Sequence, residues 1–141
     1  MDQDAWDELE SMPPRDRARV EVVLTRLLIM QKTGRWDTGA EIARGAIRAY
    51  PDRPDLYLIG AYAIRRSEDV QSALDFLEIG HGCMGEEATY WFNIGCYHCQ
   101  LGDLGEAKRC VKKAVSLDKS FQMMALDDED LEPLWEELGS A

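Results

Sequence analysis

An all-α fold of stacked antiparallel helix pairs, wound into a superhelix, is predicted by three features of the sequence. Small residues recur every 34 positions, in one column at Gly39, Ala73 and Ala107 and in another at Ala46, Gly80 and Ala114. Apolar residues within each 34-residue unit follow the three-and-four spacing of a helix, and strand signals are weak. A period of this length is typical of helix-pair repeats that stack into a solenoid.

The period divides the chain into three units, at residues 20–53, 54–87 and 88–121. The third unit shows the pattern most clearly. One face of its first helix carries residues spaced i, i+3, i+4 and i+7, namely Trp91, Ile94, Gly95 and His98. We expect Gly102 to end that helix in the left-handed conformation and Asp103 to cap the second helix. Helical spacing then resumes at Ala107, Val111 and Ala114.

The third unit resembles the tetratricopeptide repeat. Residues Trp91 to His98 read W-x₂-I-G-x₂-H where the family has W-x₂-L-G-x₂-Y, and small residues follow at Ala107 and Ala114. The second unit matches less closely, with Tyr57 in the column of the family's Trp, and the first is looser still in its leading helix. The resemblance implies a superhelix of three repeats that binds other proteins without catalysis.

Both ends of the chain are expected to cover the ends of this stack. Residues 4–12 lie one period before the second helix of the first unit, which predicts a leading half-repeat that Pro13 and Pro14 end. Residues 122–141 are acidic and carry an apolar stripe of helical spacing, namely Leu131, Leu134, Trp135 and Leu138. Because a solenoid must cover its last apolar face, this segment is predicted to form a capping helix, within a single domain.

Charge argues against several kinds of partner. The formal net charge is −11, and residues 1–10 and 122–141 together carry twelve of the 27 acidic residues and none of the 16 Lys and Arg residues. Since nucleic acids and anionic lipids are bound by clustered basic residues, neither is an expected partner. The chain has no apolar run long enough to cross a bilayer and no resemblance to a signal peptide, so we expect a cytoplasmic protein with free thiols.

The candidate chemical groups are four cysteines and two histidines. Cys96 and Cys99 lie three residues apart on one predicted helix, which leaves a metal- or thiol-redox protein as an alternative. Structural zinc pairs of this spacing usually lie on turns, whereas these two cysteines are expected inside a helix. His98 is expected on a different side of that helix from Cys96, so it cannot join the same site. No metal or cofactor is therefore expected. The sequence has no motif for a nucleophile or a phosphate-binding loop, so an enzyme is not expected.

The resemblance places the first helix of each unit along a concave groove. The groove residues implied in this way are Leu24, Leu28 and Lys32, then Leu58, Tyr62, Arg65 and Arg66, and then Phe92, Cys96 and Cys99. The apolar side chains suit an extended segment or a helix of a partner protein, and the basic ones favour an acidic partner. The expected function is therefore to bind a peptide or helix in this groove.

Two other uses of the groove stay open. The acidic C-terminal segment can cover it within the same molecule, or can bind a second copy and make the protein a self-associating unit. A role as an adaptor for chaperone tails is not expected, because family members with that role resemble one another in a clamp of Lys, Asn and Arg. The corresponding columns here hold Leu24, Leu28, Ile59, Thr89 and Asn93.

Overall fold

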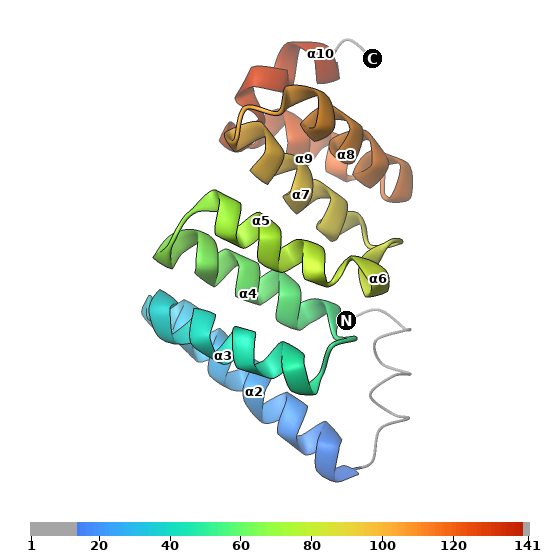
Figure 1. Ribbon diagram of the computed structural model, residues 1–141. Coiled ribbons are helices and arrows are strands. Elements are labelled where there is room, and N and C mark those ends of the chain that lie inside the picture. The colour runs from blue at the N-terminus through green and yellow to red at the C-terminus, as the bar shows by residue number, and fades with distance from the viewer. Residues whose placement is uncertain (1–13, 140–141) are drawn as a thin grey trace.

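The computed structural model describes residues 14–139, which are helical throughout with no strand (Figure 1). The helices are α2 (Pro14–Thr33), α3 (Trp36–Ala49), α4 (Pro54–Ser67), α5 (Val70–Ile79), α6 (His81–Met84), α7 (Ala88–Gln100), α8 (Leu104–Leu117), α9 (Phe121–Asp127), the 3₁₀-helix η1 (Glu129–Leu134) and α10 (Trp135–Gly139). The leading helix expected at residues 4–12 lies outside the described residues. Within the described range, no helix is both long and apolar enough to span a membrane.

Three antiparallel helix pairs, α2 with α3, α4 with α5 and α7 with α8, follow one another along the molecule in chain order (Figure 1). Their second helices begin at Trp36, Val70 and Leu104, at intervals of 34 residues. Helix α2 begins at Pro14, ahead of residue 20, because a proline fits the first turn of a helix, where its missing N–H is not needed. The 34-residue period is therefore visible in the helix boundaries themselves.

The turn that ends α7 has the conformation expected from its residues. Gly102 has a φ of 87°, in the left-handed region, and the amide of Asp103 donates to the carbonyl of His98. The carboxylate of Asp103 accepts a hydrogen bond from the amide of Glu106 at 3.3 Å, which caps α8. Both predictions for this turn are confirmed, and Gly34 (φ 71°) ends α2 in the same way.

Small residues allow the paired helices to approach closely. A Cβ atom added to Gly95 of α7 would lie 2.7 Å from Cγ2 of Val111 on α8, inside van der Waals contact. Ala107, Val111 and Ala114 of α8 are fully buried against this side of α7. The repeating small residues are thus the sites where one helix of a pair fits against the other.

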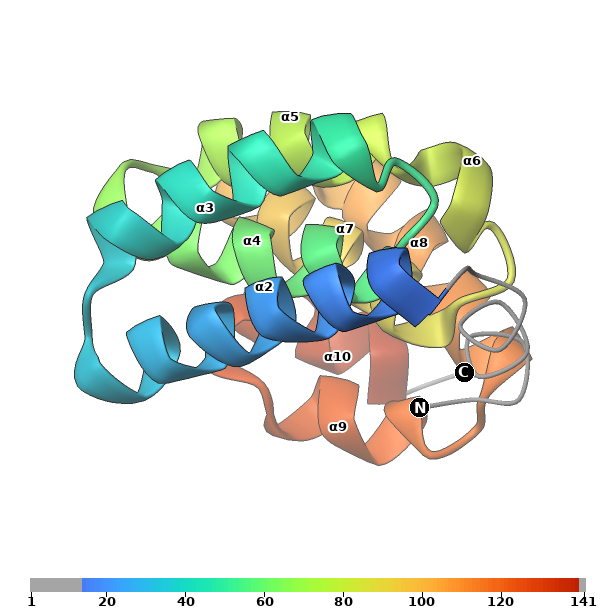
Figure 2. The ribbon, with the colours of Figure 1, turned by 90° about the horizontal axis from the view of Figure 1, so that it is seen from below.

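The C-terminal segment, which we call the tail (residues 121–139), is an integral part of the second of two apolar clusters. The first cluster lies mainly within α2 to α5 and extends to α7. The second joins α7 and α8 to buried side chains of the tail, namely Phe121, Ala125, Leu131, Leu134 and Leu138. In Figure 2, α3 and α5 form one layer, α2, α4 and α7 lie beside it, and α9 and α10 lie on the far side of this second layer.

The tail differs from the single capping helix that the spacing of its apolar residues predicts. It is divided into α9, η1 and α10, with Pro133 inside η1. Proline has no amide hydrogen and clashes with the preceding turn, so a continuous α-helix through residue 133 is disfavoured. Leu131, Leu134 and Leu138 are nevertheless buried as their spacing suggests, because all three face the α7–α8 pair.

Candidate binding surface on the first helices

The first helices α2 and α4 present part of the expected groove to solvent. Leu28 is 51% exposed and Tyr62 is 38% exposed, both high values for large apolar side chains. Lys32 and Arg66 are also exposed, whereas Leu24 and Leu58 are half-buried. We call these residues the α2–α4 strip: Leu24, Leu28, Lys32, Leu58, Tyr62 and Arg66.

The part of the groove on α7 is covered by the tail, which corrects the expectation for three residues. Phe92, Cys96 and Cys99 are all buried, in the same apolar cluster as Leu131 and Leu134. The rings of Phe92 and Phe121 lie 5.2 Å apart between centroids. These three residues of α7 therefore form part of the core beneath the tail and are not exposed on the surface.

Arg65 also contacts the tail, through an ion pair with Asp130. Its guanidinium donates two hydrogen bonds to the carboxylate of Asp130, with N···O distances of 2.6 and 2.9 Å, and its carbon lies 5.6 Å from the ring centroid of Tyr97. The hydrogen bond to Asp130 raises the pKa of Arg65, although burial opposes this. Gln100 fixes the same tail residue from α7, because its amide donates to the carbonyl oxygen of Asp130 at 3.0 Å. Arg65 is thus a residue that holds the tail in place.

Arg66, the next residue, is held by aromatic rings instead of a carboxylate. Its guanidinium carbon lies 4.9 Å from the ring centroid of Tyr62 and 5.3 Å from that of Trp36. One of its N–H groups donates to the hydroxyl of Tyr62 at 2.7 Å, and the two rings meet edge to face at 5.5 Å. No carboxylate of residues 19–139 pairs with Arg66. Sequence reasoning did not single out Trp36 as part of this surface.

The tail brings two carboxylates to one of the two cysteines considered for metal binding. The Sγ atom of Cys96 and one carboxylate oxygen each of Asp128 and Asp130 lie within 4.8 Å of one another, a grouping that does not include Cys99. Burial, together with the two carboxylates, raises the pKa of Cys96, and burial also raises that of Cys99. Because a thiol must lose its proton to act as a nucleophile or a metal ligand, these environments oppose both roles.

Both histidines of the chain line a hollow of about 310 Å³, together with Glu78, Tyr90, Trp91, Ile94, Glu106 and Arg109. Nδ1 of His81 lies 2.8 Å from the hydroxyl of Tyr90, and burial raises the pKa of that tyrosine to about 12. His98 lies 3.9 Å from a carboxylate oxygen of Glu78. No sequence motif indicates this grouping, because its residues come from four separate helices, α5, α6, α7 and α8.

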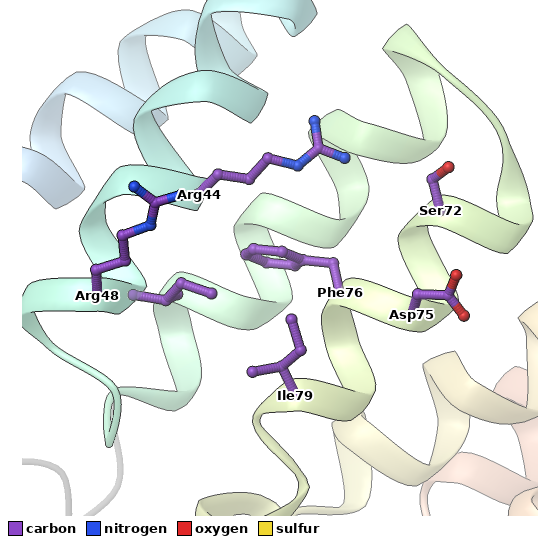
Figure 3. A pocket seen from close by; sticks show the side chains of 7 residues that line it. Arg44, Arg48, Ser72, Asp75, Phe76 and Ile79 are labelled. Carbon is purple, nitrogen blue, oxygen red and sulfur yellow. The ribbon is translucent and has the colours of Figure 1, made fainter.

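A second hollow, of about 410 Å³, lies between α3 and α5 (Figure 3). These two helices lie on the side of α4 that faces away from α9 and α10 (Figure 2). Arg44 and Arg48 project from α3, and Phe76 and Ile79 project toward them from α5 (Figure 3). Arg44 is already paired with Glu68 at 2.5 Å. Arg48 and Ile79 are exposed, like Arg66 and Leu28 of the α2–α4 strip, so substitutions at Arg48 and Ile79 provide matched controls.

The folded chain is a helical-repeat protein, in which helix pairs of one period stack side by side. The family model of the tetratricopeptide repeat matches residues 88–121, the third unit of the sequence. The third unit therefore has the tetratricopeptide-repeat pattern, within a chain whose three helix pairs share one period. A search of curated proteins found no match.

Solved structures with the same fold extend over most of the chain. The first tetratricopeptide domain of Spaghetti (RPAP3), bound to the HSP90 peptide SRMEEVD, aligns with a TM-score of 0.68 at 16% identity and covers 84% of this chain and 89% of its own. PcrH in complex with the chaperone binding region of PopD aligns with a TM-score of 0.66 at 20% identity, covering 87% of each chain. PcrH with the corresponding region of PopB gives 0.67 at 18% identity, covering 92% and 97%. At these identities the likeness shows the fold.

Proposed function

We propose that this protein is a non-catalytic interaction module that binds a peptide or helix of a partner protein on the α2–α4 strip. The observation that carries this proposal is the pairing of exposed apolar and basic side chains on two neighbouring helices. Leu28 and Lys32 lie one turn apart on α2, and Tyr62 and Arg66 lie one turn apart on α4. Exposed aromatic and arginine residues are the types that contribute most to protein interfaces.

The solved structures support binding of a peptide segment as the general mode. Spaghetti (RPAP3) holds a short peptide of HSP90 with three acidic residues, and PcrH holds regions of PopD and PopB. An acidic partner segment also suits the exposed bases of this chain, Lys32 and Arg66. Of the clamp residues expected of a chaperone-tail adaptor, the sequence columns considered above hold one asparagine, Asn93, and no Lys or Arg, so a different acidic segment is proposed.

The tail restricts the proposed site to the first two helix pairs. Displacing the tail would expose four large apolar side chains, which costs on the order of 6–12 kcal/mol at about 1.5–3 kcal/mol each. A partner of micromolar affinity supplies about 8 kcal/mol, which lies within that range, so displacing the tail would use most or all of its binding free energy. We therefore place the partner beside the tail.

The alternative class, a metal- or thiol-redox protein, has one favourable observation, the grouping of Cys96 with Asp128 and Asp130. Both oxygens of Asp130 already accept hydrogen bonds from Arg65, so a cation would have to break that ion pair. We expect protein purified without chelator to contain far less than one equivalent of zinc. Stoichiometric zinc that is lost in the Cys96→Ala variant would favour the alternative.

Capture of a partner from a lysate of the source organism tests the proposal. The test variant carries Leu28→Glu with Arg66→Glu, and the control carries Ile79→Glu with Arg48→Glu. Each replaces one exposed aliphatic residue and one exposed arginine, but the control lies on α3 and α5. We expect a protein that the wild type and the control retain and the test variant loses.

Two results would contradict this assignment. One is a partner that both variants retain or that only the control loses. The other is a concentration-dependent dimer in light scattering that the test variant disrupts, because the strip would then be a contact between two copies of the chain.

A further inference from the structure

A cavity of about 360 Å³ lies where the turn between α2 and α3 meets the C-terminal end of α4. Residues 34–38 line one side, and Arg66 and Ser67 line the other. Arg66 also belongs to the α2–α4 strip, so this cavity adjoins the surface on which we place the partner.

Arg66 is positioned as a receptor for an anion. Four other arginines, Arg44, Arg53, Arg65 and Arg109, have a carboxylate partner within the described residues. Arg66 instead is held between Trp36 and Tyr62, and among the described side chains only Tyr62 accepts a hydrogen bond from it. Stacking fixes a guanidinium without using its donors, so less rotational entropy is lost when an oxyanion binds.

A second polar group in the cavity lacks a partner. The hydroxyl of Ser67 is buried and forms no hydrogen bond with any described residue. At the opposite wall, Arg35 precedes α3 and its side chain makes no capping hydrogen bond to the first turn of that helix. Buried polar groups in proteins are normally satisfied, so an unpaired hydroxyl beside an arginine indicates a place for a polar ligand.

The charge of the lining distinguishes between anions. Arg35 and Arg66 contribute two positive charges and Asp37 one negative charge, which leaves a net charge of +1. A single carboxylate balances this charge, whereas a phosphate group carries about −1.5 to −2 and would remain partly unneutralised next to Asp37. The rings of Trp36 and Tyr62 offer apolar contact to the methylene groups of a glutamate side chain.

We propose that this cavity is the subsite that receives one acidic side chain of the partner, with Arg66 as the group that binds its carboxylate. The inference deepens the proposed function and rests on it. It identifies the partner segment as one that places a glutamate or aspartate at the end of α4, beyond the apolar contacts with Leu28 and Tyr62.

Binding of hexaglutamate, followed through the Nε–H resonances of the arginine side chains, tests this subsite directly. In the wild-type protein we expect a saturable shift of the Arg66 resonance. Arg66→Gln should weaken hexaglutamate binding about tenfold or more, as expected for the loss of a hydrogen bond to a charged group. Arg48→Gln is the matched control, because Arg48 is an exposed arginine on α3 that pairs with no carboxylate of residues 19–139, and it should leave binding unchanged. Trp36→Leu should weaken binding severalfold while the charge is retained.

Three outcomes would overturn the inference. They are the absence of any Arg66 shift at millimolar hexaglutamate, an equal loss in Arg66→Gln and Arg48→Gln, and a tighter response of Arg66 to inorganic phosphate than to hexaglutamate. Thermal melting of each variant shows that it is folded. The proposed function and the subsite are tested by different measurements. Leu28→Glu alone should abolish partner capture, which tests the strip, and should leave the hexaglutamate shift of Arg66 intact, which tests the subsite.

Discussion

Arg65 and Arg66 are adjacent on α4 but contribute to different parts of the molecule. Successive residues of a helix point about 100° apart, so the two guanidinium groups cannot serve one surface equally. Arg65 reaches Asp130, 65 residues away in the sequence, whereas Arg66 lies against Trp36 and Tyr62. Sequence reasoning grouped both as one basic edge, because the repeat pattern gives the helix of each residue but not the position of the tail.

A double-mutant cycle measures the contact between Arg65 and Asp130. The two side chains are 29% and 27% exposed, so solvent weakens their attraction, and we expect a coupling energy of about 1 kcal/mol. Urea denaturation of Arg65→Ala, Asp130→Ala and the double variant gives this value. Arg66→Ala should cost less than about 0.5 kcal/mol. If Arg66→Ala were as costly as Arg65→Ala, the different roles given to the two arginines would be wrong.

The thiols should be unreactive in the folded protein. Burial raises the pKa of Cys110 to about 12 and also raises that of Cys96. A raised pKa lowers the thiolate fraction below the pKa, to about one part in ten thousand for Cys110 at pH 8. Iodoacetamide at pH 8, followed by peptide mass spectrometry, should modify both residues only after unfolding in urea. Rapid modification of Cys96 in the native protein would instead favour a thiol function.

At the scale of helices, the sequence predicts most of the architecture and fails where the period ends. The second helices begin 34 residues apart, and Gly102 and Asp103 form the expected turn, because these features depend on local chemistry that repeats in each unit. The division of the tail into α9, η1 and α10 is not predicted, although Pro133 provides a local signal against one continuous helix.

Two glycine-to-alanine substitutions measure two different contributions to stability, helix propensity at Gly45 and the packing of α7 against α8 at Gly95. Gly95 and Gly45 both lie inside helices, but a Cβ atom at Gly95 meets Val111 at 2.7 Å, whereas one at Gly45 has nothing within 4 Å. Gly95→Ala should therefore destabilise the protein by about 1–3 kcal/mol. Gly45→Ala should stabilise it by about 0.5–1 kcal/mol. Thermal melting checks both, and a stabilising Gly95→Ala would contradict the close approach of α7 and α8.

For the whole molecule, the main consequence of the fold is that the tail covers α7, while α2 and α4 keep exposed side chains such as Leu28 and Tyr62 among the described residues. Two observations in the sequence point toward this, namely the apolar stripe of the tail and its concentration of acidic residues. They leave open whether the tail covers its own chain or a second copy. The answer depends on the chain path after α8, which brings Leu131 onto α7 and Asp130 to Arg65.

Removal of the tail tests whether it is part of the fold. A chain that ends at Ser120 loses the side chains that cover Phe92, Cys96 and Cys99. The lost burial is on the order of 6–12 kcal/mol, which is comparable to the total stability of about 5–15 kcal/mol that domains possess. We expect the truncated chain to lose its cooperative thermal transition and to bind a hydrophobic dye. A truncated chain that melts like the wild type would show that the tail is dispensable for the fold.

The most direct test of the central claim, that a partner binds the α2–α4 strip beside an intact tail, is amide hydrogen exchange with and without the captured partner. We predict that protection increases in α2 and α4 and stays unchanged in residues 121–139. Increased protection on α7 together with faster exchange throughout the tail would show that the partner displaces the tail. That result would contradict the account.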